Sequence, residues 1–367
     1  MLHRARHGVI CAPTRPEYSG RAFYQSFGGA FHMPTQIWAS FMATIALAAA
    51  LAGAACSRPA RAPDGGRIVV VVTVDWEGAE LSLDGLDALD SLRRRLGPVP
   101  VTHFVSAAYL TKSRPDPAAA ATIGQAVRAD DELAIHLHAW RSLVMASGIE
   151  PKLSPSFLTG TDQLLTFEDG DIGFDTDLDA YSVAELRVML RTSRLLLAQT
   201  QRPVSGAFRA GGYLGTPKVL QAIQEEGFTV DSSAIDFRRL DEQHDAVLSR
   251  RLGELWPNVE PSTPPWQLRP GMLELPIAAL ADYATADQIA ATLEAARARW
   301  RANPRRDVVV VIGCHLETAH DFAGRLADAL AKLRARPDQD GLVFTTISGA
   351  AARIRSADAL NGGPETR

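Results

Sequence analysis

The feature that most constrains the fold is an apolar run at residues 68–74, which is followed directly by Asp75, Trp76 and Glu77. The run is made almost entirely of β-branched residues and shows no polar alternation, a pattern typical of a strand buried on both faces. Two carboxylates therefore stand at the carboxyl end of a buried strand. We expect the rest of the chain to bring partners to them.

Six further short apolar runs alternate with helical patterns along the chain. The predicted strands are residues 99–105, 132–136, 204–208, 228–231, 308–312 and 342–346. The predicted helices are residues 84–96, 117–127, 182–199, 217–226, 284–301 and 319–333. Strands that alternate with helices indicate an α/β fold with a parallel sheet or barrel.

Two long stretches interrupt this alternation. Residues 139–181 are polar, rich in Gly and Asp, and without periodicity, and residues 235–280 are rich in Pro and Trp, with only 273–277 resembling a strand. Insertions of this length are usually functional or disordered, and we predict that the first one covers a site. Its acidic part, 168–177, lacks the spacing and the final glutamate of an EF-hand calcium loop.

The first residues, 1–56, are typical of an export segment. Residues 37–55 are small, apolar and uncharged, several arginines precede them, and Cys56 follows. This ending resembles a bacterial lipoprotein signal, in which the cysteine is lipidated; plain secretion and an uncleaved membrane anchor are the alternatives. Residues 57–66 would then be a tether. The expected location is the bacterial envelope, in the periplasm or at the cell surface, with lipid attachment to the membrane.

The composition fits a single soluble domain. The chain is 46% hydrophobic and 22% charged, with a net charge of −4. It therefore lacks the excess of basic residues expected of a nucleic-acid-binding protein. Residues 67–356 suit one large α/β domain, and 357–367 are expected to be a disordered tail. With Cys56 lipidated, Cys314 is the one cysteine of the mature domain, and we predict that it is a small buried thiol.

Ionisable side chains recur at the ends of the predicted strands. Asp75 and Glu77 follow the first strand, and the later ones end near His136, His138, Arg209, Asp231 and His315. In a parallel barrel these ends share one face, where catalysis takes place. Residues far apart in the sequence are therefore predicted to converge.

At these positions the sequence resembles the polysaccharide deacetylases, which form carbohydrate esterase family four and carry the NodB homology domain. The similar segments, in chain order, are residues 73–75, 132–136, 208–212, 227–233 and 313–315. The resemblance spans roughly residues 66–350. It implies a single catalytic domain folded as a distorted (β/α)7 barrel.

The resemblance also implies catalytic roles. Asp75 would be the base, His315 the general acid, and Arg209 would pair with Asp75 and favour its charged form. The roles of Asp75 and Glu77 could also be exchanged. Asp231 is expected to hydrogen-bond residues of the site.

The metal ligands are carried over with two departures from the family pattern. His136 matches the first histidine ligand, but Trp76 and Trp140 stand where the family has a carboxylate and a second histidine. We therefore predict Glu77 and His138 as the replacements. Two imidazoles and a carboxylate suit zinc first, with cobalt or nickel as substitutes. Trp76 and Trp140 could stack on sugar rings or pack beneath the insertions.

The implied function is the metal-dependent hydrolysis of the amide C–N bond of an N-acetylated polysaccharide or glycan outside the cytoplasm. One alternative is a glycan-binding lipoprotein that keeps the fold without catalysis. The departures at Trp76, Trp140 and Gly211 suggest it, the last standing where the family has a proline. Another is an amidohydrolase that acts on a small non-peptide amide. His103, in the second predicted strand, is expected to be a hydrogen-bonded wall residue instead of a ligand.

Overall fold

The strand that ends in the two carboxylates lies in the interior of the sheet. The structure is a computed structural model that describes residues 65–114, 116–240, 246–335 and 341–360. In it β1 (Ile68–Trp76) is buried along its whole length. It pairs in parallel with β9 (Val308–His315) along one edge, and with β10 (Leu342–Thr345) and then β2 (Val101–Val105) along the other. The prediction of a strand buried on both faces is confirmed.

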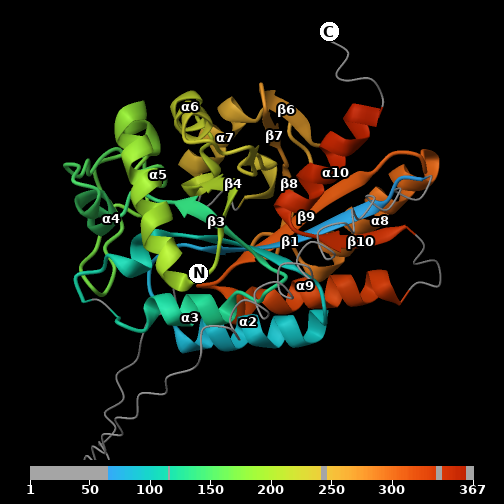
Figure 1. The fold of residues 1–367 in the computed structure, drawn as a ribbon, viewed down its shortest axis with the longest axis horizontal. Helices are drawn as coiled ribbons and strands as arrows, with labels where there is room; N and C mark the ends of the chain where they lie inside the picture. The colour runs from blue at the N-terminus through green and yellow to red at the C-terminus, as the bar shows by residue number, and fades with distance from the viewer. Residues whose placement is uncertain (1–64, 115, 241–245, 336–340, 361–367) are drawn as a thin grey trace, which may run out of the picture. The chain divides into compact units, whose positions relative to one another are not determined.

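The strands are hydrogen-bonded in the order β6-β7-β5-β4-β3-β2-β1-β9-β8 (Figure 1). The remaining bounds are β3 (Glu132–Leu137), β4 (Val204–Ala210), β5 (Val230–Asp231), β6 (Trp266–Arg269), β7 (Met272–Glu274) and β8 (Ile277–Leu280). All neighbours are parallel except β6 and β7. The stretch that carries β7 and β8 pairs first with β5 and then with β9, so the sheet curls round as a distorted α/β barrel, as predicted.

The last predicted strand does not take the seventh position of this barrel. β10 pairs with the first half of β1, and β2 takes over that edge from Val72 onward. The position between β5 and β9 belongs to β7 and β8, in the region predicted to be irregular. Pro276 separates these two short strands, and a proline cannot donate a ladder hydrogen bond, which explains why the pattern was weak.

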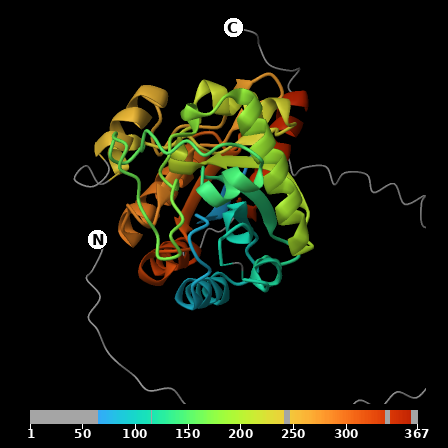
Figure 2. The same cartoon turned by 90° about the vertical axis from the view of Figure 1, so that its left-hand side faces the viewer.

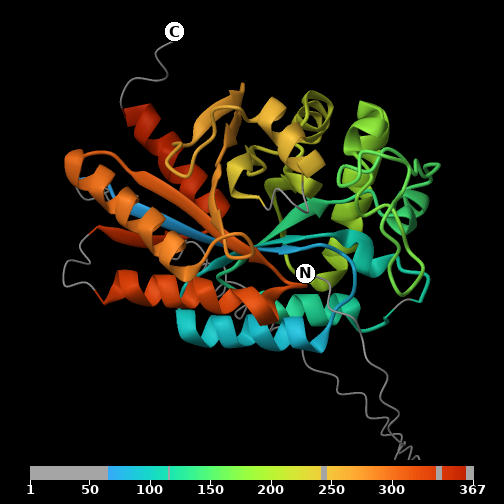
Figure 3. The ribbon, with the colours of Figure 1, turned by 180° about the vertical axis from the view of Figure 1, so that it is seen from behind.

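Helices cover the outer face of the sheet, and the last helix packs against its inner face. The helices outside the two insertions are α2 (Leu83–Leu96), α3 (Ala119–Ala126), α5 (Val183–Leu197), α6 (Pro217–Glu225), α8 (Ala286–Ala302), α9 (Ala319–Arg334) and α10 (Ile347–Leu360). Figures 1 and 3 show α2, α3 and α9 along one side of the sheet. Alternate residues of β1, such as Val70 and Val72, pack in the cluster that includes these helices, while Val69 and Val71 pack inside the barrel with residues of α10.

The two insertions contain helices that the sequence pattern did not predict. The first holds α4 (Arg141–Ala146) and η2 (Leu178–Ala180), and the second holds η5 (Phe237–Arg239) and α7 (Ala246–Leu255). The other short turns are η1 (Ala107–Leu110), η3 (Ala198–Thr200) and η4 (Gly211–Tyr213). Figure 2 views the molecule from the side of α4. α4 and the 3₁₀ turns give too few turns for a period to be recognised.

The predicted export segment, 1–56, and most of the tether lie outside the described residues. All described elements belong to one compact unit, Pro63–Arg367. Its last helix, α10, continues to Leu360, so the segment predicted to be a disordered tail begins with helix. Among the helices of the described residues, none is both long and apolar enough to cross a bilayer.

Candidate active site

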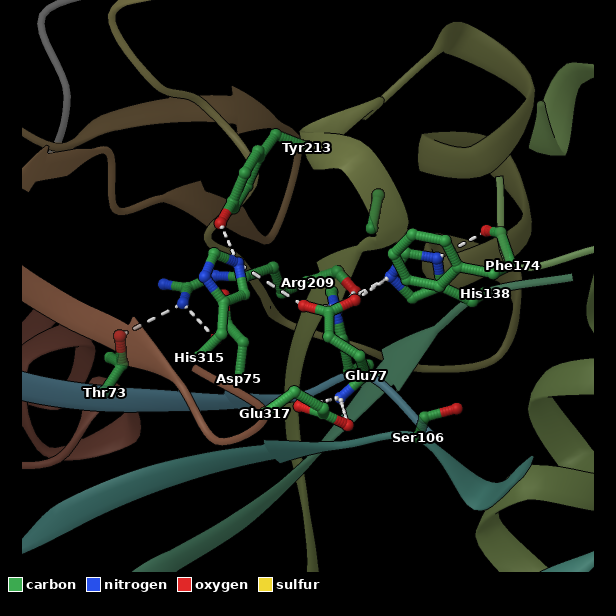
Figure 4. A network of polar contacts seen from close by, with 12 residues as sticks. Thr73, Asp75, Glu77, Ser106, His138, Phe174, Arg209, Tyr213, His315 and Glu317 are labelled. Atoms are coloured by element: carbon green, nitrogen blue, oxygen red, sulfur yellow. Dashed lines mark hydrogen bonds and ion pairs between the residues drawn. The ribbon is translucent and has the colours of Figure 1, made fainter. Parts of the chain in front are cut away.

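The alternation of β1 explains why Glu77 stands near Asp75 while Trp76 does not. Val69 and Val71 pack inside the barrel, and a period of two puts Asp75 on the same face. Trp76 packs on the opposite face with the helices. Glu77, the first residue after the strand, returns to the inner face, where its carboxylate lies within 4.8 Å of a carboxylate oxygen of Asp75 (Figure 4).

Glu77 lies against two histidines from β3. Its Oε2 is 2.6 Å from His138 Nε2, and its Oε1 is 3.4 Å from His136 Nε2. The two Nε2 atoms are 3.1 Å apart. Because the chain is extended here, side chains two residues apart point to the same face. The three residues predicted as metal ligands are therefore brought together at distances that an ion can bridge.

Each of these imidazoles is oriented by its other nitrogen. His136 Nδ1 donates to the carbonyl oxygen of Arg209 over 3.0 Å, and His138 Nδ1 donates to that of Phe174 over 2.7 Å. Both Nε2 lone pairs then face the carboxylate of Glu77, the arrangement found for metal-binding histidines.

The electrostatics of the site favour positive charge. Burial alone would raise the pKa of Glu77, but His138 and His136 hold it well below its usual range. Burial alone would lower the pKa of His136, but Glu77 raises it. An anionic carboxylate and two imidazoles with inward-facing nitrogens are a suitable donor set for a divalent cation.

Asp75 forms a buried ion pair with Arg209. Arg209 Nη1 is 2.5 Å from Asp75 Oδ1 and 3.0 Å from the hydroxyl of Thr73, and both charged side chains are fully buried. The guanidinium also donates to the carbonyl and the hydroxyl of Ser232. Within the described residues, Asp75 Oδ2 has no hydrogen-bond partner. This leaves one carboxylate oxygen free to accept a proton.

His315, from the end of β9, lies on the other side of Glu77. Its Nε2 is 3.4 Å from Glu77 Oε1, and its Nδ1 is 3.1 Å from Asp282 Oδ2. Burial alone would lower the pKa of His315, but Asp282 and Glu77 raise it to about 10. The imidazole is therefore protonated at neutral pH and can give a proton to a leaving group.

Sequence analysis did not identify three residues of this site. Asp282 follows the carboxyl end of β8, the same kind of position as the predicted site residues, but β8 was not predicted as a strand. Tyr213 follows two glycines after β4, and its hydroxyl is 2.7 Å from His315 Nε2. Glu317, two residues beyond His315, accepts the backbone N–H of Glu77 at 3.1 and 3.2 Å.

Trp76 and Trp140 do not offer a face to a sugar, because both rings are fully buried. Trp76 Nε1 donates to His103 Nδ1 over 3.1 Å, and His103 is the hydrogen-bonded wall residue that was predicted. Trp140 Nε1 donates to the carbonyl oxygen of Glu77 over 2.8 Å. Trp140 therefore fixes the backbone of a candidate ligand instead of binding substrate.

The first insertion contacts the site through Phe174. Its ring stacks on His138, with centroids 4.4 Å apart and an interplanar angle of 11°. The insertion is held to η1 by Lys112, whose ammonium is 3.0 Å from Asp171 Oδ2 and 3.5 Å from the ring centre of Trp140. The ion pair and cation–π contact thus fix the loop that orients a metal-ligand candidate.

Asp231 faces away from the reacting groups. Val230 packs inside the barrel, so its neighbour Asp231 lies on the other face of β5, directly opposite Glu274 of β7. Both carboxyls are fully buried, and burial raises the pKa of both, that of Glu274 to well above its usual range. Asp231 Oδ2 and Glu274 Oε2 have no conventional hydrogen-bond partner in the described structure. A proton on Glu274 would allow a hydrogen bond between these two carboxyl oxygens.

Glu274→Gln should flatten the pH dependence of stability. Glu274 binds its proton more tightly in the folded state, so its stabilising contribution is complete below the unfolded pKa and is lost as pH rises toward the folded pKa. An amide donates to Asp231 at every pH. We expect the variant to be roughly 1–3 kcal/mol more stable than the parent at pH 8, and similar at pH 4, in urea unfolding. Equal pH dependence of parent and variant would contradict the shared proton.

Asp282→Asn should lower turnover by about 10- to 100-fold, because the asparagine cannot hold the His315 imidazolium by charge. The loss should be larger at alkaline pH, since Asp282 is the main group that raises the pKa of His315. A pH–rate profile measures this, with Asp321→Asn, an exposed residue of α9, as the control. An unchanged alkaline limb would argue against His315 as the acid.

The chain was also compared with known proteins. No protein-family model and no curated protein matches it. Among solved structures, it is similar to a polysaccharide deacetylase candidate from Mycobacterium smegmatis, with a TM-score of 0.48, 19% identity, and coverage of 84% of this chain and 97% of that chain. It is also similar to Puue allantoinase, with a TM-score of 0.46, 13% identity and coverage of 79% and 91%. A third similar structure is the Xyl-CE4 domain of a multidomain xylanase from the hindgut metagenome of Trinervitermes trinervoides. Its TM-score is 0.42 and its identity 12%, with coverage of 79% of this chain and 92% of that chain. Likenesses of this degree do not extend to activity.

Proposed function

We propose that the protein is a metal-dependent hydrolase that removes acetyl groups from an N-acetylated glycan by cleaving the amide C–N bond. The observation that carries this proposal is the grouping of Glu77, His136 and His138 beside the Asp75–Arg209 pair and the His315–Asp282 pair. A base, an acid and a cation site thus lie within one small volume.

Each residue has a chemical task in this proposal. Glu77, His136 and His138 would hold a divalent ion, most suitably zinc, which supplies a Lewis acid for the carbonyl and for water. Asp75 would take a proton from the attacking water through its free Oδ2, and His315 would give one to the departing nitrogen. Water oxygen bonds to the carbonyl carbon, the C–N bond breaks, and acetate and a free amine are released.

The non-catalytic alternative was suggested by Trp76, Trp140 and Gly211, and the geometry offsets the first two departures. Glu77 supplies a carboxylate beside the histidines, and His138 supplies the second imidazole. Since residues suited to act as acid, base and metal ligands lie close together, a hydrolase accounts for more of the site than a binding protein does.

A small amide is the second candidate substrate. The side chains of Glu77 and His315 are only 12% and 15% exposed, and the other reacting groups are buried. Such enclosure suits a compact substrate, or the end of a glycan chain, better than the middle of a long polymer. The reaction would be the same cleavage of a non-peptide C–N bond.

We also propose that the enzyme acts outside the cytoplasm, attached to the bacterial envelope through a lipid on Cys56. The support is the sequence alone: an uncharged apolar run at residues 37–55, preceded by arginines and followed by that cysteine. Labelling with a radioactive fatty acid, compared between the parent and Cys56→Ser, tests this. A label that persists in the variant would disprove lipidation at Cys56.

One experiment tests the enzymatic proposal. The purified protein is assayed for zinc by elemental analysis and for acetate release from N-acetylated oligosaccharides, with ammonia and amine release from small amides measured in parallel. We expect about one tightly bound zinc per chain, and activity that a chelator removes and zinc restores. Protein that binds no divalent metal, or activity that survives complete metal removal, would overturn the proposal.

A further inference from the structure

Glu77 belongs to two groups of potential metal ligands. The first is Glu77 with His136 and His138, and the second is Glu77 with Asp75 and His315. In each group the ligand atoms all lie within 4.8 Å of one another. The second group consists of the residues proposed as base and acid, together with the carboxylate of Glu77.

The carboxylate of Glu77 is placed to serve both groups at once. Its Oε2 lies 2.6 Å from His138 Nε2, while its Oε1 is 3.4 Å from His136 Nε2 and also 3.4 Å from His315 Nε2. Carboxylates of this kind bridge pairs of ions about 3.5–4 Å apart in two-metal sites.

The other two ligands of the second group also have donor atoms that face it. His315 Nδ1 is held by Asp282, so its Nε2 faces Glu77, as in the first group of histidines. Asp75 is fully buried, and its Oδ2 has no hydrogen-bond partner among the described residues. A buried carboxylate oxygen without a partner is costly, and a cation would satisfy it.

We propose that Asp75, Glu77 and His315 form a second divalent-cation subsite that shares Glu77 with the first. It binds more weakly than the first, for two reasons. The hydroxyl of Tyr213 lies 2.7 Å from His315 Nε2, and both this contact and the proton carried by Nε2 must be displaced. The guanidinium of Arg209 already balances the charge of Asp75.

Occupation of this subsite has a consequence for catalysis that rests on the proposed function. An ion held by Asp75 and His315 prevents the first from accepting a proton and the second from giving one. Excess metal therefore inhibits the enzyme that one equivalent activates. The number of bound ions can be measured without an activity assay, so the subsite can be tested separately from the proposed function.

Metal counting tests the subsite directly. The full chain is titrated with zinc in equilibrium dialysis and examined by native mass spectrometry. We expect two ions per chain for the parent and for His320→Ala, an exposed histidine outside the site, but one for His315→Ala and for Asp75→Asn. Circular dichroism shows whether each variant folds. If one of the two does not fold, the other still tests the subsite. A parent that saturates at one ion, or a second ion retained by both variants, would refute the subsite.

A spectroscopic measurement separates this subsite from adventitious surface binding. Two Mn²⁺ ions bridged by Glu77 should give an exchange-coupled electron paramagnetic resonance spectrum, which His315→Ala converts into that of an isolated ion. Uncoupled ions in the doubly loaded parent would contradict the proposal. Two coupled ions in a protein that releases no acetate would keep the subsite and refute the proposed function.

Discussion

Replacing Asp75 with asparagine should lower the turnover number by about 10²- to 10⁴-fold, the usual contribution of a general base. Asparagine keeps an oxygen that can accept from Arg209 Nη1, so the packing around the buried pair is retained. It cannot take up the proton of the attacking water. The measurement is kcat for acetate release, together with the number of tightly bound zinc ions, which should stay at one.

The control for this prediction is Asp328→Asn. Asp328 forms an exposed ion pair with Arg95 on the outside of the protein, and its loss should not change turnover. Glu77→Gln is the informative comparison, because it should remove the tightly bound ion. If instead Asp75→Asn loses the metal and Glu77→Gln keeps it, the roles of the two carboxylates are the reverse of those proposed.

Much of the fold could be predicted because its signals are local. An uninterrupted β-branched run such as that of β1 has few alternatives to a strand buried on both faces. The capping box of Ser182 and Glu185, which forms in the structure, marks the start of α5 from sequence alone. The β7–β8 stretch could not be predicted in this way, because its pairing with β5 and then β9 is decided by tertiary contacts.

In the candidate site, too, some residues could be predicted from local sequence patterns and others could not. The grouping of Glu77 with His136 and His138 follows from the period of two at the ends of β1 and β3, once the strands are placed. Asp282 and Tyr213 were missed, because their contacts with His315 depend on loops whose path is set by distant residues. Burial could not be predicted either: from the sequence, Trp140 could stack on a sugar or pack beneath an insertion, and in the fold it is fully covered.

Replacing Arg209 with methionine should cost about 3–5 kcal/mol of unfolding free energy, the largest effect on stability that we expect from a single substitution. Asp75 would stay buried with its compensating charge removed, and the hydrogen bonds to Ser232 would also be lost. Urea unfolding measures the change. Arg95→Met, which breaks a surface ion pair, is the control and should cost at most about 1 kcal/mol.

The double variant Asp75→Asn/Arg209→Met shows whether that cost comes from the uncompensated charge. With the carboxylate neutralised, methionine at position 209 should destabilise much less than it does in the parent, so the two substitutions should be strongly non-additive. If methionine costs the same with aspartate as with asparagine at position 75, the loss comes from packing and from the contacts with Ser232. A strong coupling would instead mean that the barrel tolerates a buried carboxylate only because Arg209 is there, which ties the stability of the fold to the residue proposed as its base.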